Sequence, residues 1–188
     1  FVVIQTAGDI SNFFSNIWPI SFFSFEDLRL FFSLVLIAIS CIIMGAGIPT
    51  TATYIILVAV AAPALAQLGI EPLVAHFFVF YYGVLADITP PVALAAYAAS
   101  GIAKSNPFKT GNTAFRLGIA KALVPFVFVY SPSLLLITGE FQTNELILTL
   151  TGALIGIALI GIAFSGYWFR RLKKYEQLII GIGSLFFV

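Results

Sequence analysis

The feature that most constrains this chain is a series of apolar stretches, each close to the length of a membrane-spanning helix. They cover residues 28–44, 52–68, 114–137 and 146–169, and a longer one runs from 73 to 103. A helix needs about 20 apolar residues to cross the hydrocarbon core of a bilayer. Charged residues make up only 9% of the 188 residues, whereas soluble domains carry about 25%. These patterns predict an all-α polytopic membrane protein embedded in the lipid bilayer.

Composition also argues against several classes of function. The nine basic residues are too few to form a phosphate-binding face, so no nucleic-acid partner is expected. The single cysteine, Cys41, cannot form a disulfide within the chain and is expected to be a buried thiol. An aspartyl intramembrane protease needs paired acids, whereas only Asp87 is embedded in apolar sequence, and the chain has no HExxH motif. We therefore expect no enzyme and no cofactor.

The basic residues define an orientation, because basic loops stay in the cytoplasm. If the loop 104–112 is cytoplasmic, counting crossings puts 170–176 on the same side and puts 69–72 and 138–145 outside. Arg29 is the exception and is expected to snorkel from a helix end. The basic residues that agree with this orientation are Lys104, Lys109, Arg170, Arg171, Lys173 and Lys174.

The chain divides into three parts. Residues 1–27 begin with Phe and show no signal-peptide pattern, and they mix aromatic, polar and acidic residues. They are expected to be the end of a preceding helix followed by an interfacial segment. Residues 28–137 contain two breaks in otherwise apolar sequence, and 138–188 hold C-terminal transmembrane helices that the chain end cuts short. We expect a fragment of a larger protein, its C-terminal part.

The first break is the stretch GAGIPTT, residues 45–51. It lies between two apolar arms, 28–44 and 52–68. Each arm would rise about 26 Å as a helix, against a hydrocarbon core of about 30 Å. The break carries no charge, which is unusual for a loop that reaches the cytosol. The sequence leaves two alternatives: a re-entrant helical hairpin with its tip inside the protein, or two ordinary spanning helices joined by a tight turn.

The second break lies in the stretch 73–103, which would be about 46 Å long as one helix. Pro90 and Pro91 remove two backbone donors, and Pro90 disfavours helical dihedrals at Thr89. We expect two half-helices with an unwound link at 86–91, near the middle of the membrane. Unpaired backbone is tolerated there only where it is buried in protein or lines a wet cavity.

Together the breaks predict a binding site for an ion and a substrate. Unwound links expose carbonyl oxygens, and half-helix ends carry partial charges that attract ions. Hard cations such as Na⁺ prefer oxygen ligands, and glycines allow the backbone to approach closely. The assigned site residues are Gly45, Gly47, Pro49, Thr50, Thr51, Ala86, Asp87, Thr89 and Pro90, with Thr50, Thr51, Asp87 and Thr89 as candidate sodium ligands.

Several polar residues have two interpretations. Asp87 either belongs to the ion site or caps the second half-helix. His76 lies about one turn from the predicted external turn, and an interfacial hydrogen bond is expected rather than a proton relay. Arg116 and Lys121 are expected early in a helix, as snorkelling anchors, with contact to an anionic substrate as the alternative.

At the two breaks the chain resembles the large membrane subunit of TRAP transporters, the tripartite ATP-independent periplasmic carriers. The resemblance is carried by GAGIPTTATYIILVAVAAPAL and by HFFVFYYGVLADITPPVALAAYAASGIA. It runs from about residue 30 to 137, and more loosely through FSGYWFRRLKKYEQ. The most similar branch is the fused-permease branch that works with TAXI-type binding proteins.

This resemblance implies an elevator-type secondary transporter built from two inverted repeats, with sodium between a hairpin tip and an unwound link. Residues 45–51 match the second hairpin tip, and 86–91 match the second broken helix. Many relatives have a small neutral residue where this chain has Asp87, so backbone carbonyls can suffice as ligands. The implied partners are the N-terminal half of the same permease, a small membrane subunit or its fused equivalent, and a periplasmic substrate-binding protein. The implied location is a bacterial or archaeal cytoplasmic membrane.

Two functions remain open at this point. The first is the C-terminal part of a sodium-coupled symporter that imports organic anions such as carboxylates. The alternative is a structural or assembly subunit without its own site, for which two breaks in mid-membrane would have no explanation. The sequence does not define the substrate or the number of coupled ions.

Overall fold

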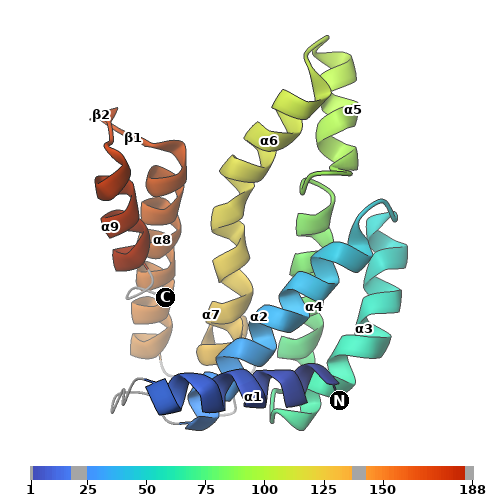
Figure 1. Ribbon diagram of the computed structural model, residues 1–188, viewed down its shortest axis with the longest axis vertical. Coiled ribbons are helices and arrows are strands. Elements are labelled where there is room, and N and C mark those ends of the chain that lie inside the picture. The colour runs from blue at the N-terminus through green and yellow to red at the C-terminus, as the bar shows by residue number, and fades with distance from the viewer. Residues whose placement is uncertain (1, 18–24, 137–142, 185–188) are drawn as a thin grey trace.

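The computed structural model describes residues 2–17, 25–136 and 143–184 (Figure 1). Its elements in chain order are α1 (Val2–Ile17), α2 (Phe25–Gly45), α3 (Thr50–Gln67), α4 (Pro72–Ala86), α5 (Leu94–Ile102), α6 (Pro107–Gly118), the 3₁₀ helix η1 (Ile119–Leu123), α7 (Val124–Tyr130), the 3₁₀ helix η2 (Pro132–Leu135), α8 (Thr143–Ser165), β1 (Tyr167–Trp168), β2 (Arg170–Arg171) and α9 (Lys174–Ser184).

Helices α2 and α3 form an antiparallel hairpin (Figure 1). Glu26 and Asp27 lie in the first turn of α2, where acidic side chains favour the positive end of the helix dipole. The helix ends at Gly45, and α3 begins after Pro49, whose φ of −55° and ψ of 140° are not helical. The short connection agrees with the break that the sequence predicts.

Helices α4 and α5 are the two half-helices that the sequence predicts. Helix α4 follows a turn in which Gly69 has a φ of +78°. The second half-helix begins at Leu94 and not at Val92, because Ala93 adopts left-handed dihedrals with φ 38° and ψ 49°. The unwound link is therefore residues 87–93, slightly longer than expected.

The next helix begins earlier than the sequence predicts. We expected a loop over 104–112 and a helix from 114, but α6 begins at Pro107. The side chain of Asn106 accepts a hydrogen bond from the Lys109 N–H at 3.0 Å, which caps the first turn. The helical path then continues through η1 to Tyr130. It ends there, earlier than the predicted end at 137, because Ser131 leaves helical dihedrals with a φ of −138° and a ψ of 75°, and the separate 3₁₀ helix η2 follows.

The C-terminal part consists of α8 and α9, which run antiparallel beside each other and are joined by a tight turn (Figure 1). The sequence predicts a basic loop over 170–176, but β1 and β2 form a small antiparallel ladder there and α9 starts at Lys174. Most of the predicted loop 138–145 and the last residues, 185–188, lie outside the described part of the chain.

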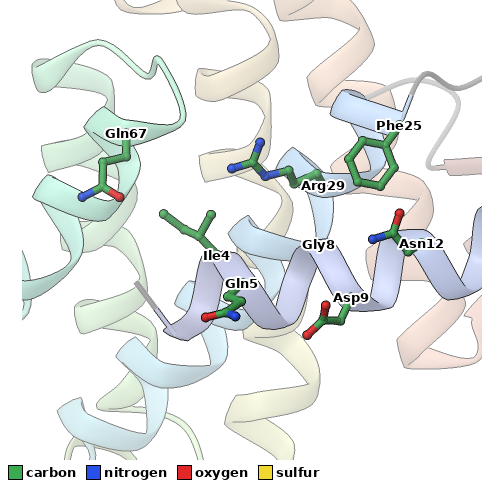
Figure 2. A pocket seen from close by; sticks show the side chains of 8 residues that line it. All are labelled: Ile4, Gln5, Gly8, Asp9, Asn12, Phe25, Arg29 and Gln67. Atoms are coloured by element: carbon green, nitrogen blue, oxygen red, sulfur yellow. The ribbon is translucent and has the colours of Figure 1, made fainter.

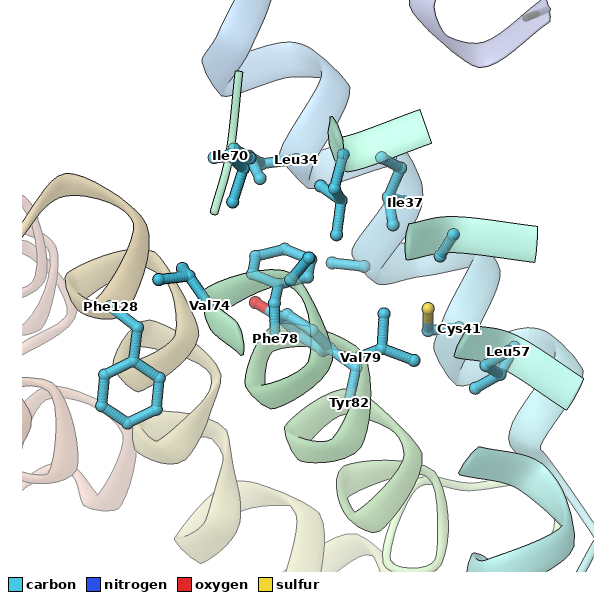
Figure 3. Packing of buried hydrophobic residues seen from close by; sticks show 14 of the residues in the cluster. Leu34, Ile37, Cys41, Leu57, Ile70, Val74, Phe78, Val79, Tyr82 and Phe128 are labelled. Atoms are coloured by element: carbon cyan, nitrogen blue, oxygen red, sulfur yellow. The ribbon is translucent and has the colours of Figure 1, made fainter. Parts of the chain in front are cut away.

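The core surrounds α4, which packs between the α2–α3 hairpin and α7 (Figure 3). Phe78, Leu34 and Leu65 are completely buried there. The Phe78 ring contacts the Tyr82 ring at a centroid distance of 5.0 Å and the Phe126 ring at 5.8 Å. Because α4 contacts the elements on both sides, it fixes the position of the link that follows it.

Four helical stretches among the described residues are long and apolar enough to cross a membrane: Phe25–Gly45, Thr50–Gln67, Pro107–Tyr130 and Thr143–Ser165. Helix α1 lies crosswise at the foot of these helices, as an interfacial segment would (Figure 1). Apart from the two-residue strands β1 and β2, the regular structure described is helical. The chain is an all-α polytopic membrane protein, as the sequence predicts.

Candidate functional site

The two sequence breaks meet in space. Figure 1 shows the turn between α2 and α3 beside the link between α4 and α5, well below the α5–α6 turn. A methyl group added at Gly45 would lie 2.9 Å from the Ala86 Cβ and 2.9 Å from the Thr53 Cγ2. Those distances are too short for any side chain, so only glycine permits this contact. The two candidate site residues Gly45 and Ala86 therefore form a direct contact between the hairpin and α4.

Gly47 makes a second close approach at the hairpin tip. Its φ is +86°, a conformation that other residues rarely adopt. A methyl group added there would lie 3.3 Å from the Val92 Cγ1, in the link. The tip therefore contacts the discontinuous helix at both ends of its link.

A hydrogen bond joins the two breaks. The Thr50 hydroxyl donates to the Asp87 Oδ2 at 2.6 Å, and both side chains are partly buried. Asp87 is the residue that ends α4, and its side chain does not cap α5, because the N-cap of α5 is Ala93 and has no side-chain hydrogen bond. The structure thus disagrees with the cap interpretation of Asp87. Only the Asp87 main-chain carbonyl reaches α5, where it accepts from the Ala95 N–H at 3.1 Å.

The remaining threonines differ in their hydrogen bonds. The Thr89 hydroxyl donates to the Leu85 carbonyl at 2.7 Å, and the Thr53 hydroxyl donates to the Ile48 carbonyl at 3.1 Å. Thr51 is exposed, and in the described part of the chain its hydroxyl has no hydrogen-bond partner. Of the four candidate sodium ligands, Thr50 and Asp87 therefore contact each other. Thr51 directly follows Thr50 in the chain, and Thr89 lies two residues after Asp87.

Tyr97 is a residue of this site that the sequence reasoning missed. Its hydroxyl donates to the Pro91 carbonyl at 2.7 Å. The peptide bond between Pro90 and Pro91 is cis. Tyr97 lies six residues after Pro91 in the first half of α5, so its position near the link was the only available signal. It satisfies one of the carbonyls that the unwound link exposes.

Helix α6 and η1 form a third wall, which the sequence also did not predict. Gly118 is in contact with Ile88 of the link, so closely that an added methyl group would overlap the Ile88 side chain. Within η1, the Ala122 carbonyl accepts a hydrogen bond from the Tyr82 hydroxyl at 2.7 Å. These contacts hold the link from the side opposite to the hairpin contacts at Gly45 and Gly47.

Oxygen atoms are the main polar groups of this region. Carboxylate and hydroxyl oxygens come from Asp87, Thr50 and Thr51, and among the described residues no hydrogen bond engages the carbonyl oxygens of Gly47 and Ile88. Oxygen ligands of these kinds are those that hard cations prefer. No group of three or more His, Cys, Asp or Glu side chains that could hold a metal ion occurs in residues 2–17, 25–136 and 143–184.

Two other polar predictions have different outcomes. His76 forms the expected kind of hydrogen bond, with its Nδ1 2.7 Å from the Tyr54 hydroxyl. Arg116 and Lys121, however, do not lie early in their helix. Since α6 begins at Pro107, Arg116 is in its last turn and Lys121 is in η1. Both lie far from the ends of the stretch Pro107–Tyr130, so snorkelling from a helix end does not describe them.

A cavity lies elsewhere, at the foot of the molecule between α1, the start of α2 and the end of α3 (Figure 2). Its volume is about 390 Å³. Figure 2 shows Arg29 and Gln67 on one side of it and Asp9 on α1. Arg29 is engaged by Glu26 at 3.3 Å. None of the assigned site residues lines this cavity.

A protein-family model matches the part of the chain that contains both breaks. The family described as "Tripartite ATP-independent periplasmic transporter, DctM component" matches residues 13–143, which include the hairpin, the link and α6–α7. No curated protein and no solved structure matches the chain. The matched segment covers more than half of the chain, and so the chain belongs to the DctM family of tripartite transporter components.

Proposed function

We propose that this chain is the C-terminal part of a sodium-coupled symporter that imports organic anions, carboxylates above all. The observation that carries the proposal is the hydrogen bond of 2.6 Å between Thr50 on the hairpin and Asp87 on the link. It joins a hydroxyl at the first residue of α3 to a carboxylate at the first residue of the unwound link.

The proposed cation site consists of oxygen ligands. Na⁺ would be held by Asp87 and by threonine hydroxyls, with the carbonyls of Gly47 and Ile88 completing the shell. Carbonyls that no helix engages are the usual ligands for a coupled ion in a transporter with discontinuous helices. When bound, the ion would supply positive charge beside the substrate.

The proposed binding site for the substrate anion is the N-terminus of α3. This helix has 18 residues and begins at Thr50, and its N-cap, Pro49, offers no side-chain hydrogen bond. The first N–H groups of a helix are unsatisfied and lie at the positive end of the helix dipole. A substrate carboxylate beside the bound cation would find both donors and positive charge there.

Membership of the DctM family supports the proposed partners. The transporter would receive its substrate from a periplasmic binding protein and would work with the N-terminal half of the permease and with a small membrane subunit or its fused equivalent. Its location would be the cytoplasmic membrane of a bacterium or archaeon. Since the hairpin and the link supply one face of the site, the other face would come from the N-terminal half.

Sodium-dependent protection of an introduced cysteine tests the ion site. In the complete transporter with Cys41→Ala, Leu94→Cys is treated with a maleimide in sodium or in choline. Leu94 follows the link directly, is 45% exposed and is none of the proposed ligands, so the thiol should react, and sodium should slow the reaction several-fold. Leu154→Cys on α8 is the control, because Leu154 is also exposed, at 59%, but lies outside the candidate site. Equal rates in sodium and choline at residue 94 would contradict the proposal.

A further inference from the structure

We propose that the C-terminal turn, residues 166–176, binds the headgroup of an anionic phospholipid. The proposal concerns a surface far from the candidate ion site, and it does not depend on sodium coupling. The turn joins α8 to α9 at one end of the molecule (Figure 1). Three independent features support the proposal. They are the depth of the turn in the membrane, its exposed aromatic side chains and its unneutralised positive charge.

The turn is an ordered structure. Tyr167 pairs with Arg171 and Trp168 pairs with Arg170 in the antiparallel ladder. Phe169 at the tip has a φ of 52°, which allows the chain to reverse. The Leu172 N–H donates to the Gly166 carbonyl at 2.9 Å and closes the turn. The side chains around the tip therefore have fixed directions.

The turn is expected at the depth of the lipid headgroups. Helix α8 has 23 residues, so it is about 35 Å long and exceeds the hydrocarbon core of about 30 Å. The turn begins directly after its last residue, Ser165. A segment in that position emerges from the hydrocarbon into the interface.

Aromatic side chains surround the tip. Phe169 is 90% exposed, Tyr167 is 59% exposed and Trp168 is 47% exposed. Such exposure would be unfavourable in water, but tyrosine and tryptophan favour the membrane interface because one end of each side chain is polar. These side chains orient the turn toward lipid.

The positive charge of the turn is only partly neutralised. Arg170 forms two hydrogen bonds with the Glu176 carboxylate, at 2.6 and 3.1 Å. Arg171, Lys173 and Lys174 are exposed and form no ion pair within the described residues. Three positive charges therefore remain beside the aromatic tip. Clusters of basic residues directly after a membrane span attract anionic headgroups.

The turn between α5 and α6, at the same end of the molecule, also carries basic residues and provides a comparison. It carries only Lys104 and Lys109, five residues apart and both exposed. It has no aromatic tip of three successive residues. Its charge can be removed without touching the C-terminal turn, which makes it a matched control.

The experiment measures contact between Trp168 and lipid. The complete transporter, with its other tryptophans replaced by phenylalanine, is placed in phosphatidylcholine nanodiscs that contain brominated phosphatidylglycerol or brominated phosphatidylcholine. Bromine quenches tryptophan fluorescence at contact. We expect half-maximal quenching at a mole fraction of phosphatidylglycerol several-fold lower than that of phosphatidylcholine, and we expect soluble glycerol phosphate to leave it unchanged.

Substitutions assign the effect to the named side chains. In Arg171→Gln/Lys173→Gln/Lys174→Gln the preference for phosphatidylglycerol should fall by roughly tenfold or more, because each basic residue near the surface is worth about fivefold. Arg171→Lys/Lys173→Arg/Lys174→Arg keeps the charges and should keep the preference. Lys104→Gln/Lys109→Gln should also keep it.

Equal quenching by both brominated lipids in the unaltered protein would overturn the proposal. So would loss of the preference in the Lys104/Lys109 variant to the same extent, since the effect would then reflect overall charge. Displacement by glycerol phosphate would overturn it as well, because the turn would then bind a soluble phosphate and not a membrane surface.

Discussion

Two turns in this protein join antiparallel helices and have opposite chemistry. The hairpin tip, residues 46–49, contains no charged residue and contacts the link after α4. The C-terminal turn contains four basic residues, an ion pair and exposed aromatic side chains. The first turn lies against other backbone, and the second lies at an end of the molecule (Figure 1).

The difference shows how the residues of a turn determine its place in a membrane protein. Backbone that is not helical must find partners, because lipid offers none. At the hairpin tip Gly47 lets the backbone approach the link closely, with Val92 as its neighbour. At the C-terminal turn the partners are charged side chains, such as Glu176 for the Lys173 N–H at 2.8 Å.

Replacing Gly45 by a larger residue should disrupt the packing of the hairpin against α4. It should produce the largest effect of the substitutions considered. In Gly45→Leu the side chain would overlap Ala86 and Thr53, so we expect a destabilisation of about 1–3 kcal/mol, as for overpacked cores, and loss of uptake. Thermal unfolding in detergent and substrate uptake into proteoliposomes measure the two effects.

The control for this prediction is Gly161→Leu in α8. Nothing lies within 4 Å of a methyl group added at Gly161, so the same substitution should leave stability and uptake close to normal. A Gly45→Leu protein with normal uptake would show that close contact between the hairpin and α4 is not needed.

Replacing the polar groups at the site should reduce uptake with a smaller change in stability. In Asp87→Asn and in Thr51→Ala we expect uptake to fall at least tenfold while the amount of folded protein stays the same. Thr50→Ala should resemble Asp87→Asn, because it removes the donor to the carboxylate. Hydrogen bonds to charged groups are worth about 1.5–3 kcal/mol, so Thr50→Ala should also lower the midpoint of thermal unfolding.

Thr151→Ala on α8 serves as the matched threonine control. Its hydroxyl bonds only within its own helix, so uptake should not change. Normal uptake in both Asp87→Asn and Thr51→Ala would instead favour a structural or assembly subunit without its own site.

The smallest expected effect concerns pH at the C-terminal turn. Hydrogen bonding from Arg170 lowers the pKa of Glu176 below its ordinary value of 4.5, and the Lys173 N–H contributes further. The ion pair therefore stabilises the turn above that ordinary value, and this contribution is lost as the pH falls through the lower pKa of the folded state. The protection factors of the turn amides, which are the intrinsic exchange rates at each pH divided by the observed rates, should fall over this range. In Glu176→Gln the protection factors should already be low at neutral pH and should show no such dependence.

The positions of the breaks could be predicted from sequence because glycine and proline act locally. Pro90 and Pro91 remove two successive backbone donors and so disfavour a continuous helix there, and the uncharged GAGIPTT stretch marks the hairpin tip. The choice between a re-entrant hairpin and two spanning helices could not be made, because it depends on what the tip contacts. In the structure the tip contacts the link at Val92.

The partners within the site were less predictable. Four threonines and one carboxylate lie near the breaks, and only the three-dimensional arrangement selects Thr50 as the donor to Asp87. Likewise, the contact between Gly118 and Ile88 joins residues thirty positions apart, and no local sequence pattern predicts it. The early start of α6 was missed for another reason, because the capping side chain of Asn106 lies within a segment that composition alone marks as a loop.

The hydrogen bond from Tyr82 to Ala122 has a mechanical consequence. Together with the Ile88–Gly118 contact, it fastens α4 and its link to the junction of α6 and η1. If the site moves across the bilayer, η1 and its flanking helices would have to move with it. A covalent bridge between positions 88 and 118 would then travel with the site, whereas a bridge from the hairpin to a stationary part of the transporter would arrest it.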